Sequence, residues 1–215
     1  MIIEERMSSF IDSLGCSNSA FLQELEEEAI RDGVPIIRPS MQSLLKLVLQ
    51  MKKPRNILEV GTATGFSALL MSEQLGADCR ITTIEKYEKR IPLAKQNFKK
   101  AGKEEQITLL EGEALDILKE LQGPYDFIFM DAAKAQYLNF LPQVIRLLAE
   151  EGILVSDNVL QDGDIMESRF VVTRRNRTIH ARMREYLYEL THHSQLITSV
   201  LPVADGVTIS LKKTK

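Results

Sequence analysis

Cysteines and long apolar runs are scarce in this sequence. The two cysteines, Cys16 and Cys79, lie far apart and lack the spacing of a metal site, which argues against a disulfide scaffold and fits a reducing compartment. No run approaches the roughly 20 apolar residues that a membrane span needs. The N-terminus, Met-Ile-Ile-Glu-Glu-Arg, lacks the basic and apolar regions of a signal peptide. We therefore expect a cytoplasmic protein that does not enter a membrane.

An excess of positive charge is also missing. The net charge of −3 argues against a protein that binds nucleic acid over its whole surface, although it says nothing about a local basic patch. With 215 residues, of which 44% are hydrophobic and 27% charged, the chain can bury a substantial core. We expect a single domain over residues 1–215, in which a helical cap (1–53) precedes a catalytic sheet core (54–215).

A glycine-bearing segment at residues 56–67 lacks the two commonest nucleotide-binding patterns. It reads Asn-Ile-Leu-Glu-Val-Gly-Thr-Ala-Thr-Gly-Phe-Ser, without the G-x-G-x-x-G of a dinucleotide site and without the Gly-Lys-Ser/Thr of a P-loop. A strand, a glycine turn and a helix start can nevertheless cradle a cofactor, because glycines allow close approach and the helix N-terminus offers free N–H donors. Packing alone also explains such turns, so this segment by itself leaves cofactor binding open.

Strands and helices alternate from residue 56 onward. Apolar, β-branched runs predict strands at 56–60, 80–85, 106–111, 125–130 and 152–156, with helices between them at 66–76, 88–101, 113–121 and 135–149. Helical periodicity also predicts helices at 2–14, at 18–31, after Pro39 and at 174–191. The last strands, at 196–202 and 206–211, flank the turn signal Asp205-Gly206. We therefore predict an α/β fold with a mostly parallel sheet, helices on both faces, extra N-terminal helices and an antiparallel C-terminal hairpin.

Acidic residues follow the predicted strands at the edge where open α/β sheets bind ligands. Glu85 ends the second strand about 20 residues after the glycine turn, a spacing that suits a carboxylate accepting ribose hydroxyls. The alternative is a surface acid at a strand end. Gly112-Glu113-Ala114 follows the third strand and could face a purine.

Asp131 and the pair Asp157-Asn158 each end a strongly apolar predicted strand. An unpaired carboxylate is costly there, and a set of oxygen donors suits a hard cation such as Mg²⁺, Mn²⁺ or Ca²⁺. Lys134 can reach the same centre, as a counter-ion or as a general base. The alternative is that each Asp only caps a following helix and that Lys134 is solvated.

Read together, these segments resemble the class I S-adenosylmethionine-dependent O-methyltransferases of the cation-dependent catechol and caffeoyl-CoA type. The matching pieces stand in the family's order over about residues 35–211: Leu-Glu-Val-Gly-Thr-Ala-Thr-Gly-Phe-Ser, Thr-Ile-Glu85, Gly-Glu-Ala114, Phe-Met-Asp-Ala-Ala-Lys134-x-x-Tyr137 and Ser-Asp-Asn158-Val. The resemblance implies a seven-stranded Rossmann-like sheet, with Lys134 as base and a metal, first of all Mg²⁺, at Asp131, Asp157 and Asn158. It further implies cofactor binding by Glu59, Gly61, Thr62, Ala63, Gly65, Ser67, Glu85, Glu113, Ala114 and Asp131.

Within that family, the C-terminal third resembles the bacterial tRNA 5-hydroxyuridine methyltransferases. The likeness rests on Arg174-Arg-Asn-Arg177, on Glu185-Tyr186 in the following helix, and on Leu-Pro-Val-Ala-Asp-Gly-Val207, where Ala204 replaces the family's usual Gly. Independently, six arginines and no acid lie between Arg169 and Arg184, which suits contacts to phosphates. Arg174, Arg175 and Arg177 are therefore candidate tRNA contacts.

Several alternatives stay open. The arginine run is also explained by a solvated helix face or by dimer contacts, and a homodimer is expected because the N-terminal helices are amphipathic. The acceptor could instead be a small molecule, a catechol or caffeoyl-type compound. A methyltransferase-like fold that binds a nucleotide or a partner without catalysis is the third hypothesis, and the intact set of Asp131, Lys134, Asp157 and Asn158 argues against it.

Overall fold

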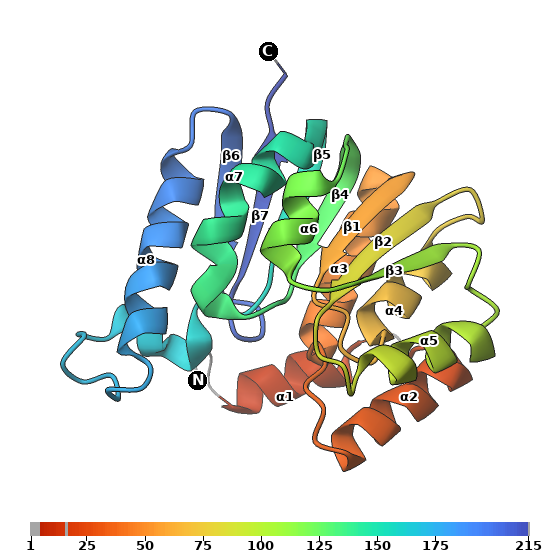
Figure 1. The fold of residues 1–215 in the computed structure, drawn as a ribbon. Coiled ribbons are helices and arrows are strands. Elements are labelled where there is room, and N and C mark those ends of the chain that lie inside the picture. Colours follow the sequence, from red (N-terminus) through yellow and green to blue (C-terminus); the bar gives the residue numbers. More distant parts are fainter. Residues whose placement is uncertain (1–4, 16, 215) are drawn as a thin grey trace.

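The structure, a computed structural model, describes residues 5–15 and 17–214 and is built around one seven-stranded sheet (Figure 1). The strand order is β3-β2-β1-β4-β5-β7-β6. Strands β1 to β5 run parallel, and β7 pairs antiparallel with both β5 and β6. The strands are β1 (Asn56–Val60), β2 (Arg80–Glu85), β3 (Ile107–Glu111), β4 (Tyr125–Met130), β5 (Leu148–Ser156), β6 (Leu196–Leu201) and β7 (Val207–Lys212). The predicted parallel sheet with a reversed terminal hairpin is confirmed.

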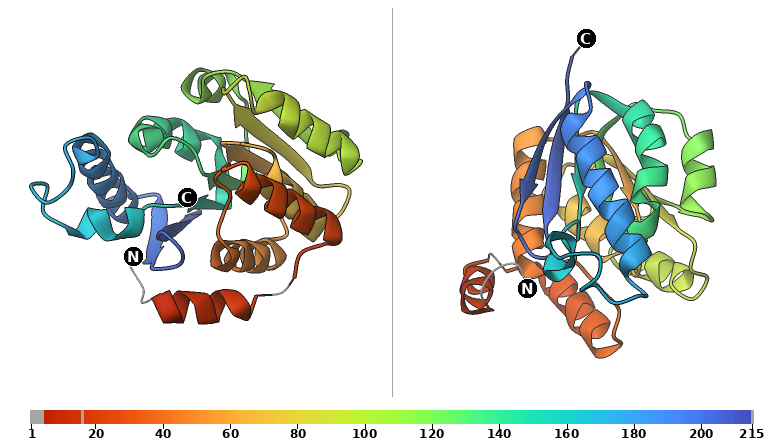
Figure 2. Two further views of the ribbon diagram at one scale, coloured as in Figure 1. Left: turned by 90° about the horizontal axis from the view of Figure 1, so that it is seen from below. Right: turned by 90° about the vertical axis from the view of Figure 1, so that its left-hand side faces the viewer.

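Helices cover both faces of the sheet. They are α1 (Glu5–Ser13), α2 (Ala20–Arg31), α3 (Pro39–Lys52), α4 (Phe66–Gln74), α5 (Ile91–Lys100), α6 (Ala114–Glu120), α7 (Tyr137–Leu147) and α8 (Arg177–His192), with short 3₁₀ helices η1 (Lys134–Gln136) and η2 (Gln161–Met166). Helices α2 to α5 contribute to one core layer, and α6 to α8 contribute to the other. Figure 2 shows α1 at the edge of the molecule, where it packs on α3.

The alternation of side chains along the strands divides the core between these two layers. In β4, Phe127 and Phe129 belong to the layer of α2 to α5, and Ile128 and Met130 belong to the opposite layer. All four are fully buried, which explains why this central parallel strand is an unbroken apolar run. The first polar side chain after that run is Asp131, which therefore emerges at the carboxyl edge of the sheet.

Predicted boundaries differ from the structure most strongly between β4 and β5, and α5 and α8 each begin three residues later than predicted. The helix predicted at 135–149 is divided into η1 and α7, and β5 begins at Leu148, four residues before its predicted start. Leu148 pairs with Tyr125 across an irregularity in the register, and Glu151 adopts a φ of +57°. The sequence Leu-Ala-Glu-Glu favours a helix locally, but pairing with β4 overrides that preference.

Residues 2–4 of the first predicted helix lie outside the described residues, as does Cys16, whereas Cys79 is buried and free. None of the helices within residues 5–15 and 17–214 combines the length and apolar character that a membrane span requires.

Candidate active site

The turn between β1 and α4 lies between the ends of β2 and β4, the two strands that flank β1 in the sheet. Its Gly61 N–H donates to the carbonyl of Ile84 in β2 (3.0 Å), and Gly61 has a φ of +106°. A Cβ at Gly61 would lie 2.1 Å from the backbone carbonyl oxygen of Asp131. A side chain at this position would therefore push the turn away from the end of β4.

Glu59 lies beneath this turn, on the same face of β1 as Ile57. Its carboxylate accepts hydrogen bonds from the hydroxyls of Ser67 and Thr83, and Thr83 also contacts the hydroxyl of Thr62 (2.5 Å). Complete burial raises the pKa of Glu59 to about 7. Glu59 therefore ties together β1, β2, the turn and the start of α4.

A cavity of about 540 Å³ opens above the turn, at the carboxyl edge of the sheet. Its volume is in the range of small-molecule and cofactor sites. Most of the predicted site residues line it: Gly61, Thr62, Ala63, Ser67, Glu85, Glu113, Ala114, Asp131, Lys134, Asp157 and Asn158. Glu59 and Gly65, predicted to bind the cofactor, do not line it, because Glu59 points into the core and a Cβ at Gly65 would face the ring of Phe98. Both residues contact neighbouring groups that hold the turn in place.

Glu85 joins the end of β2 to the glycine turn. One carboxylate oxygen accepts the N–H of Ala63 (2.8 Å), and the other accepts the N–H groups of Lys86 and Tyr87 (2.9 and 2.8 Å). A carboxylate has about four acceptor positions, so this well-anchored group retains capacity for a hydroxyl. The side chain of Glu113 is mostly exposed and pairs with Lys86 (3.0 Å).

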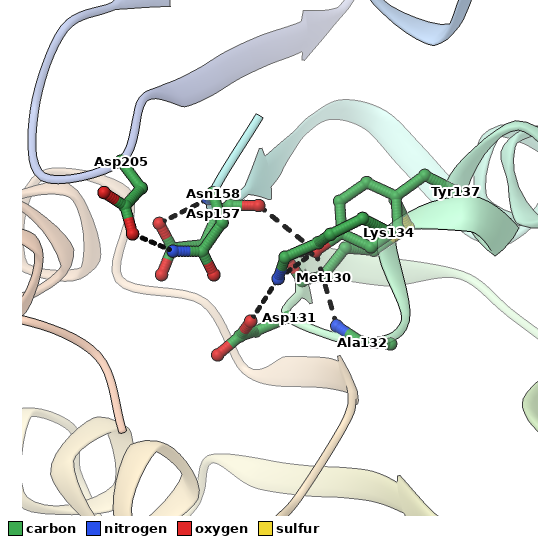
Figure 3. A network of polar contacts seen from close by, with 8 residues as sticks. All are labelled: Met130, Asp131, Ala132, Lys134, Tyr137, Asp157, Asn158 and Asp205. Carbon is green, nitrogen blue, oxygen red and sulfur yellow. Dashed lines mark hydrogen bonds and ion pairs between the residues drawn. The ribbon is translucent and has the colours of Figure 1, made fainter. Parts of the chain in front are cut away.

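Lys134 reaches back from η1 toward the end of β4 (Figure 3). Its Nζ lies 2.8 Å from Oδ1 of Asp131 and 3.3 Å from the hydroxyl of Tyr137. That buried hydroxyl also lies 3.0 Å from the carbonyl of Met130 and 3.2 Å from the carbonyl of Asp157. Tyr137 thus connects the ends of β4 and β5 with the amine.

Asp157 and Asn158 approach the same space from the end of β5 (Figure 3). Asp157 is 2% exposed, and its Oδ1 accepts the N–H of Asn158 (2.7 Å). Burial, followed by the negative charge of Asp131, raises the pKa of Asp157 to about 7. Asn158 adopts a left-handed φ of +55°, and its Nδ2 donates to Oδ2 of Asp205 (3.2 Å).

The donor set at this edge fits a hard cation through oxygen atoms. Within the described residues, no group of three or more His, Cys, Asp or Glu side chains is arranged to hold a metal ion. A cation would therefore rely on the carboxylates of Asp131 and Asp157 together with the amide oxygen of Asn158. The raised pKa of Asp157 is itself partly due to Asp131, and a positive ion would relieve that repulsion. The residues present therefore fit a divalent ion that prefers oxygen ligands.

Among the cavity residues without a predicted functional role, two charged residues contact each other. Arg38 precedes α3, and Asp205 lies in the loop between β6 and β7; their side chains form an ion pair at 2.9 Å. Burial raises the pKa of Asp205 to about 6. The sequence indicated Asp205 as part of a turn and of the segment Leu-Pro-Val-Ala-Asp-Gly-Val207, without a functional role, and in the structure it lies four residues after the end of β6.

The arginine-rich segment divides into structural and exposed groups. Arg182 donates to the carbonyl of Ala135 (2.7 Å) and Arg184 to that of Ile165 (2.9 Å), so both support the fold. Arg177, predicted as a tRNA contact, is half-buried and donates to the carbonyl of Val172 (3.3 Å). The other predicted contacts, Arg174 and Arg175, are exposed.

Similarity to known proteins extends over almost the whole chain. A family model described as O-methyltransferase matches residues 12–213. The chain is 34% identical over 162 residues to a catechol O-methyltransferase of Niastella koreensis, with 73% of each chain covered. It is 31% identical over 187 residues to a caffeoyl-CoA O-methyltransferase of Stellaria longipes, with 79% of this chain and 73% of the relative covered. The SAH-bound methyltransferase PaMTH1 of Podospora anserina has a similar structure, with a TM-score of 0.87, 27% identity and coverage of 98% and 95%.

Proposed function

Because the chain belongs to the O-methyltransferase family, we propose that its methyl acceptor is the hydroxyl of 5-hydroxyuridine in the tRNA anticodon. Methylation at this wobble position would give 5-methoxyuridine. The general activity, S-adenosylmethionine-dependent O-methylation, follows from the family membership. The observation that carries the proposed acceptor is the exposed arginine segment, which is anchored beside the cavity at both of its ends.

We propose that S-adenosylmethionine lies along the glycine turn. Gly61, Thr62, Ala63 and Ser67 line the cavity there and allow close approach of the ligand. Glu85 would accept a ribose hydroxyl with its remaining acceptor position, because three N–H groups already donate to its carboxylate. The backbone around Glu113 and Ala114 would border the purine, because the Glu113 side chain itself points to Lys86. Glu59 and Gly65 would act indirectly, by holding the turn.

The reacting end of the site is assigned to Asp131, Lys134, Asp157 and Asn158. A divalent ion bound by Asp131, Asp157 and Asn158, first of all Mg²⁺, would draw electron density from an acceptor hydroxyl and lower its pKa. Lys134, in its uncharged form, would take the proton of that hydroxyl. The acceptor oxygen would then attack the sulfonium methyl carbon of a bound S-adenosylmethionine, and the C–S bond would break with its electron pair remaining on sulfur, so that a neutral thioether would leave. Tyr137 keeps Lys134 near this point through the 3.3 Å contact.

The tRNA assignment is supported by the surroundings of the cavity. The segment that carries Arg169, Arg174 and Arg175 starts after η2, where Asp162 pairs with the cavity residue Arg38 (3.4 Å). It ends in α8, where Arg182 donates to the carbonyl of Ala135, the residue after Lys134. Exposed guanidinium groups here would contact phosphates around an acceptor base. Phe170, which is 85% exposed, adds an aromatic surface that could stack with a base.

The chemistry of the acceptor base agrees with the site. 5-Hydroxyuracil carries its hydroxyl beside the C4 carbonyl, so its two neighbouring oxygens resemble those of a catechol. The base would have to leave the anticodon stack to reach the cavity, which costs a few kcal/mol and least in single-stranded regions. An anticodon loop meets that condition.

The second candidate acceptor is a small catechol or caffeoyl-type molecule. It is favoured by the activities in the names of the relatives from Niastella koreensis and Stellaria longipes. A methyl-transfer assay with labelled S-adenosylmethionine separates the two candidates: in parallel reactions the purified protein receives either hydroxyuridine-containing tRNA or catechol and caffeoyl-CoA. Methylation of the small molecules alone would reject the tRNA proposal. A second test uses a strain that lacks the gene. If the tRNA proposal is correct, mass spectrometry of its tRNA should show unmethylated 5-hydroxyuridine.

We further propose one methyltransferase domain over residues 1–215, acting in the cytoplasm as a homodimer. Support for the dimer comes from α1 and the turn after it, where Met7, Phe10 and Leu14 are 53%, 63% and 67% exposed. An apolar surface of this kind is commonly covered by a partner. Sedimentation of the wild-type chain and of Phe10→Asp tests this directly, because a mass of one chain in both would reject the dimer.

A further inference from the structure

The loop between β6 and β7 brings Asp205 against Asn158, 47 residues earlier in the chain (Figure 3). Backbone hydrogen bonds hold this loop on the segment after β5: the N–H of Val159 donates to Gly206 and that of Leu160 donates to Asp205, both at 2.9 Å. Gly206 has a φ of +84°, and a Cβ there would lie 2.3 Å from Cγ of Leu160. The position of Asp205 is therefore fixed by backbone packing.

Arg38 holds the other side of the Asp205 carboxylate. Its guanidinium lies 2.9 Å from Oδ1 of Asp205 and 3.4 Å from Oδ1 of Asp162. The Asp205 side chain is only 15% exposed, whereas that of Arg38 is 44% exposed. Asp205 thus has one oxygen toward Arg38 and the other toward the Asn158 amide. This contact links the N-terminal helical region to the reacting end of the cavity.

The chemistry of an amide beside a carboxylate determines its orientation. A side-chain amide has an NH₂ donor on one side and a carbonyl acceptor on the other, whereas an ionised carboxylate can only accept. If Asn158 were flipped, its carbonyl oxygen would face Asp205 and repel it, and its NH₂ group would face the cavity. In the observed orientation, Nδ2 is occupied by Asp205 and the amide oxygen is left for another ligand.

We propose that Asp205 is a positioning residue that holds the amide oxygen of Asn158 ready for a divalent cation, and that Arg38 holds Asp205 in place. This inference rests on the proposed cation site at Asp131, Asp157 and Asn158. It gives the loop after β6 and the segment before α3 a defined role in that site, although neither of them supplies a ligand. Partners behind a metal ligand commonly set its orientation in this way.

Metal affinity, measured without turnover, tests the proposal. Binding of Mn²⁺ is followed by electron paramagnetic resonance of the free ion, and binding of S-adenosylmethionine is measured separately without metal. Asp205→Ala should weaken Mn²⁺ binding about 10- to 100-fold, the usual effect of losing an outer partner, and leave S-adenosylmethionine affinity unchanged. Asp205→Asn retains one acceptor oxygen for Asn158 and should lose less than Asp205→Ala.

Asp164→Ala is the matched control, because it removes the same charge from neighbouring η2 while Asp164 contacts Asn176 (3.5 Å) and not Asn158. Equal Mn²⁺ affinities of Asp205→Ala and Asp164→Ala would overturn the proposal. Equal losses in Asp205→Ala and Asp205→Asn would also overturn it, since charge alone would then be responsible. If Asp205→Ala does not fold, Arg38→Gln replaces it: a loss greater than that of Asp164→Ala supports the proposal, and unchanged affinity rejects it. Failure of the wild-type protein to bind Mn²⁺ would instead reject the cation site itself.

Discussion

The hydroxyl of Tyr137 lies 3.3 Å from Nζ of Lys134, inside a network that also includes the backbone of both strands carrying the acidic residues. The hydroxyl also accepts the N–H of Ala132 (3.3 Å). One buried oxygen therefore positions the amine relative to the ends of β4 and β5. This arrangement depends on a hydroxyl group and not on the aromatic ring alone.

Tyr137→Phe should therefore reduce kcat on the order of 10- to 100-fold through misplacement of Lys134, with little change in S-adenosylmethionine affinity. It should also destabilise the protein by about 1–3 kcal/mol, because the backbone groups of Met130, Ala132 and Asp157 lose the hydroxyl as a hydrogen-bond partner. Steady-state kinetics and urea unfolding measure the two effects. Tyr186→Phe is the control: it removes another buried hydroxyl, which bonds Ser156 (2.6 Å) and does not contact Lys134. Equal loss of kcat in both variants would contradict a specific role for Tyr137.

Glu59 should make stability depend on pH. Its pKa is about 7 in the folded protein, against an ordinary value of 4.5, so the folded state binds more protons than the unfolded state between these values. The contribution of Glu59 to the free energy of unfolding is then greatest below pH 4.5 and is lost as the pH rises through 7. We expect the free energy of unfolding of the wild type, relative to that of Glu59→Gln, to fall by about 2–3 kcal/mol between pH 5 and pH 8. Urea unfolding of both proteins measures this difference. Parallel stability curves for the two proteins would disprove this assignment.

Asp157→Ala should abolish turnover and Mn²⁺ binding, because the proposed cation site would lose its most buried carboxylate. EDTA should inactivate the wild type, and added Mg²⁺ should restore its activity. S-adenosylmethionine binding, measured by calorimetry, should survive in the variant because the glycine turn is untouched. Activity that persists both in Asp157→Ala and in the presence of EDTA would exclude a metal role.

Replacing Arg174 and Arg175 together with Ala should weaken tRNA binding and reduce its dependence on salt. Each phosphate contact in a single-stranded region contributes a slope of about 0.7 in the plot of log affinity against log salt concentration, so the slope should fall by up to roughly 1.4. Lys99→Ala/Lys100→Ala removes two exposed charges from α5 and serves as the control. An unchanged slope in the arginine variant would favour the small-molecule acceptor.

Much of the cavity was predictable because its residues follow local patterns. Apolar runs that stop at Glu85, Asp131 and Asp157 identify strand ends, and parallel strands place those ends along one edge of a sheet. The glycine turn was predictable for the same reason, since its glycines directly follow an apolar run and precede a helix; its close contact with the carbonyl of Asp131 was not. The start of β5 was mispredicted because pairing between Leu148 and Tyr125 is a long-range interaction that local helix propensity does not report.

The sequence by itself determined the order of strands and helices and the set of oxygen groups at the strand ends, because periodicity and chain direction fix both. Only the tertiary structure decided where individual side chains point and what they contact. In the structure the Glu59 side chain is buried in the core, and some arginines bond backbone carbonyls while others are exposed. Asp205 contacts both Asn158 and Arg38. Each of these outcomes depends on packing between segments far apart in the chain, which no local pattern encodes.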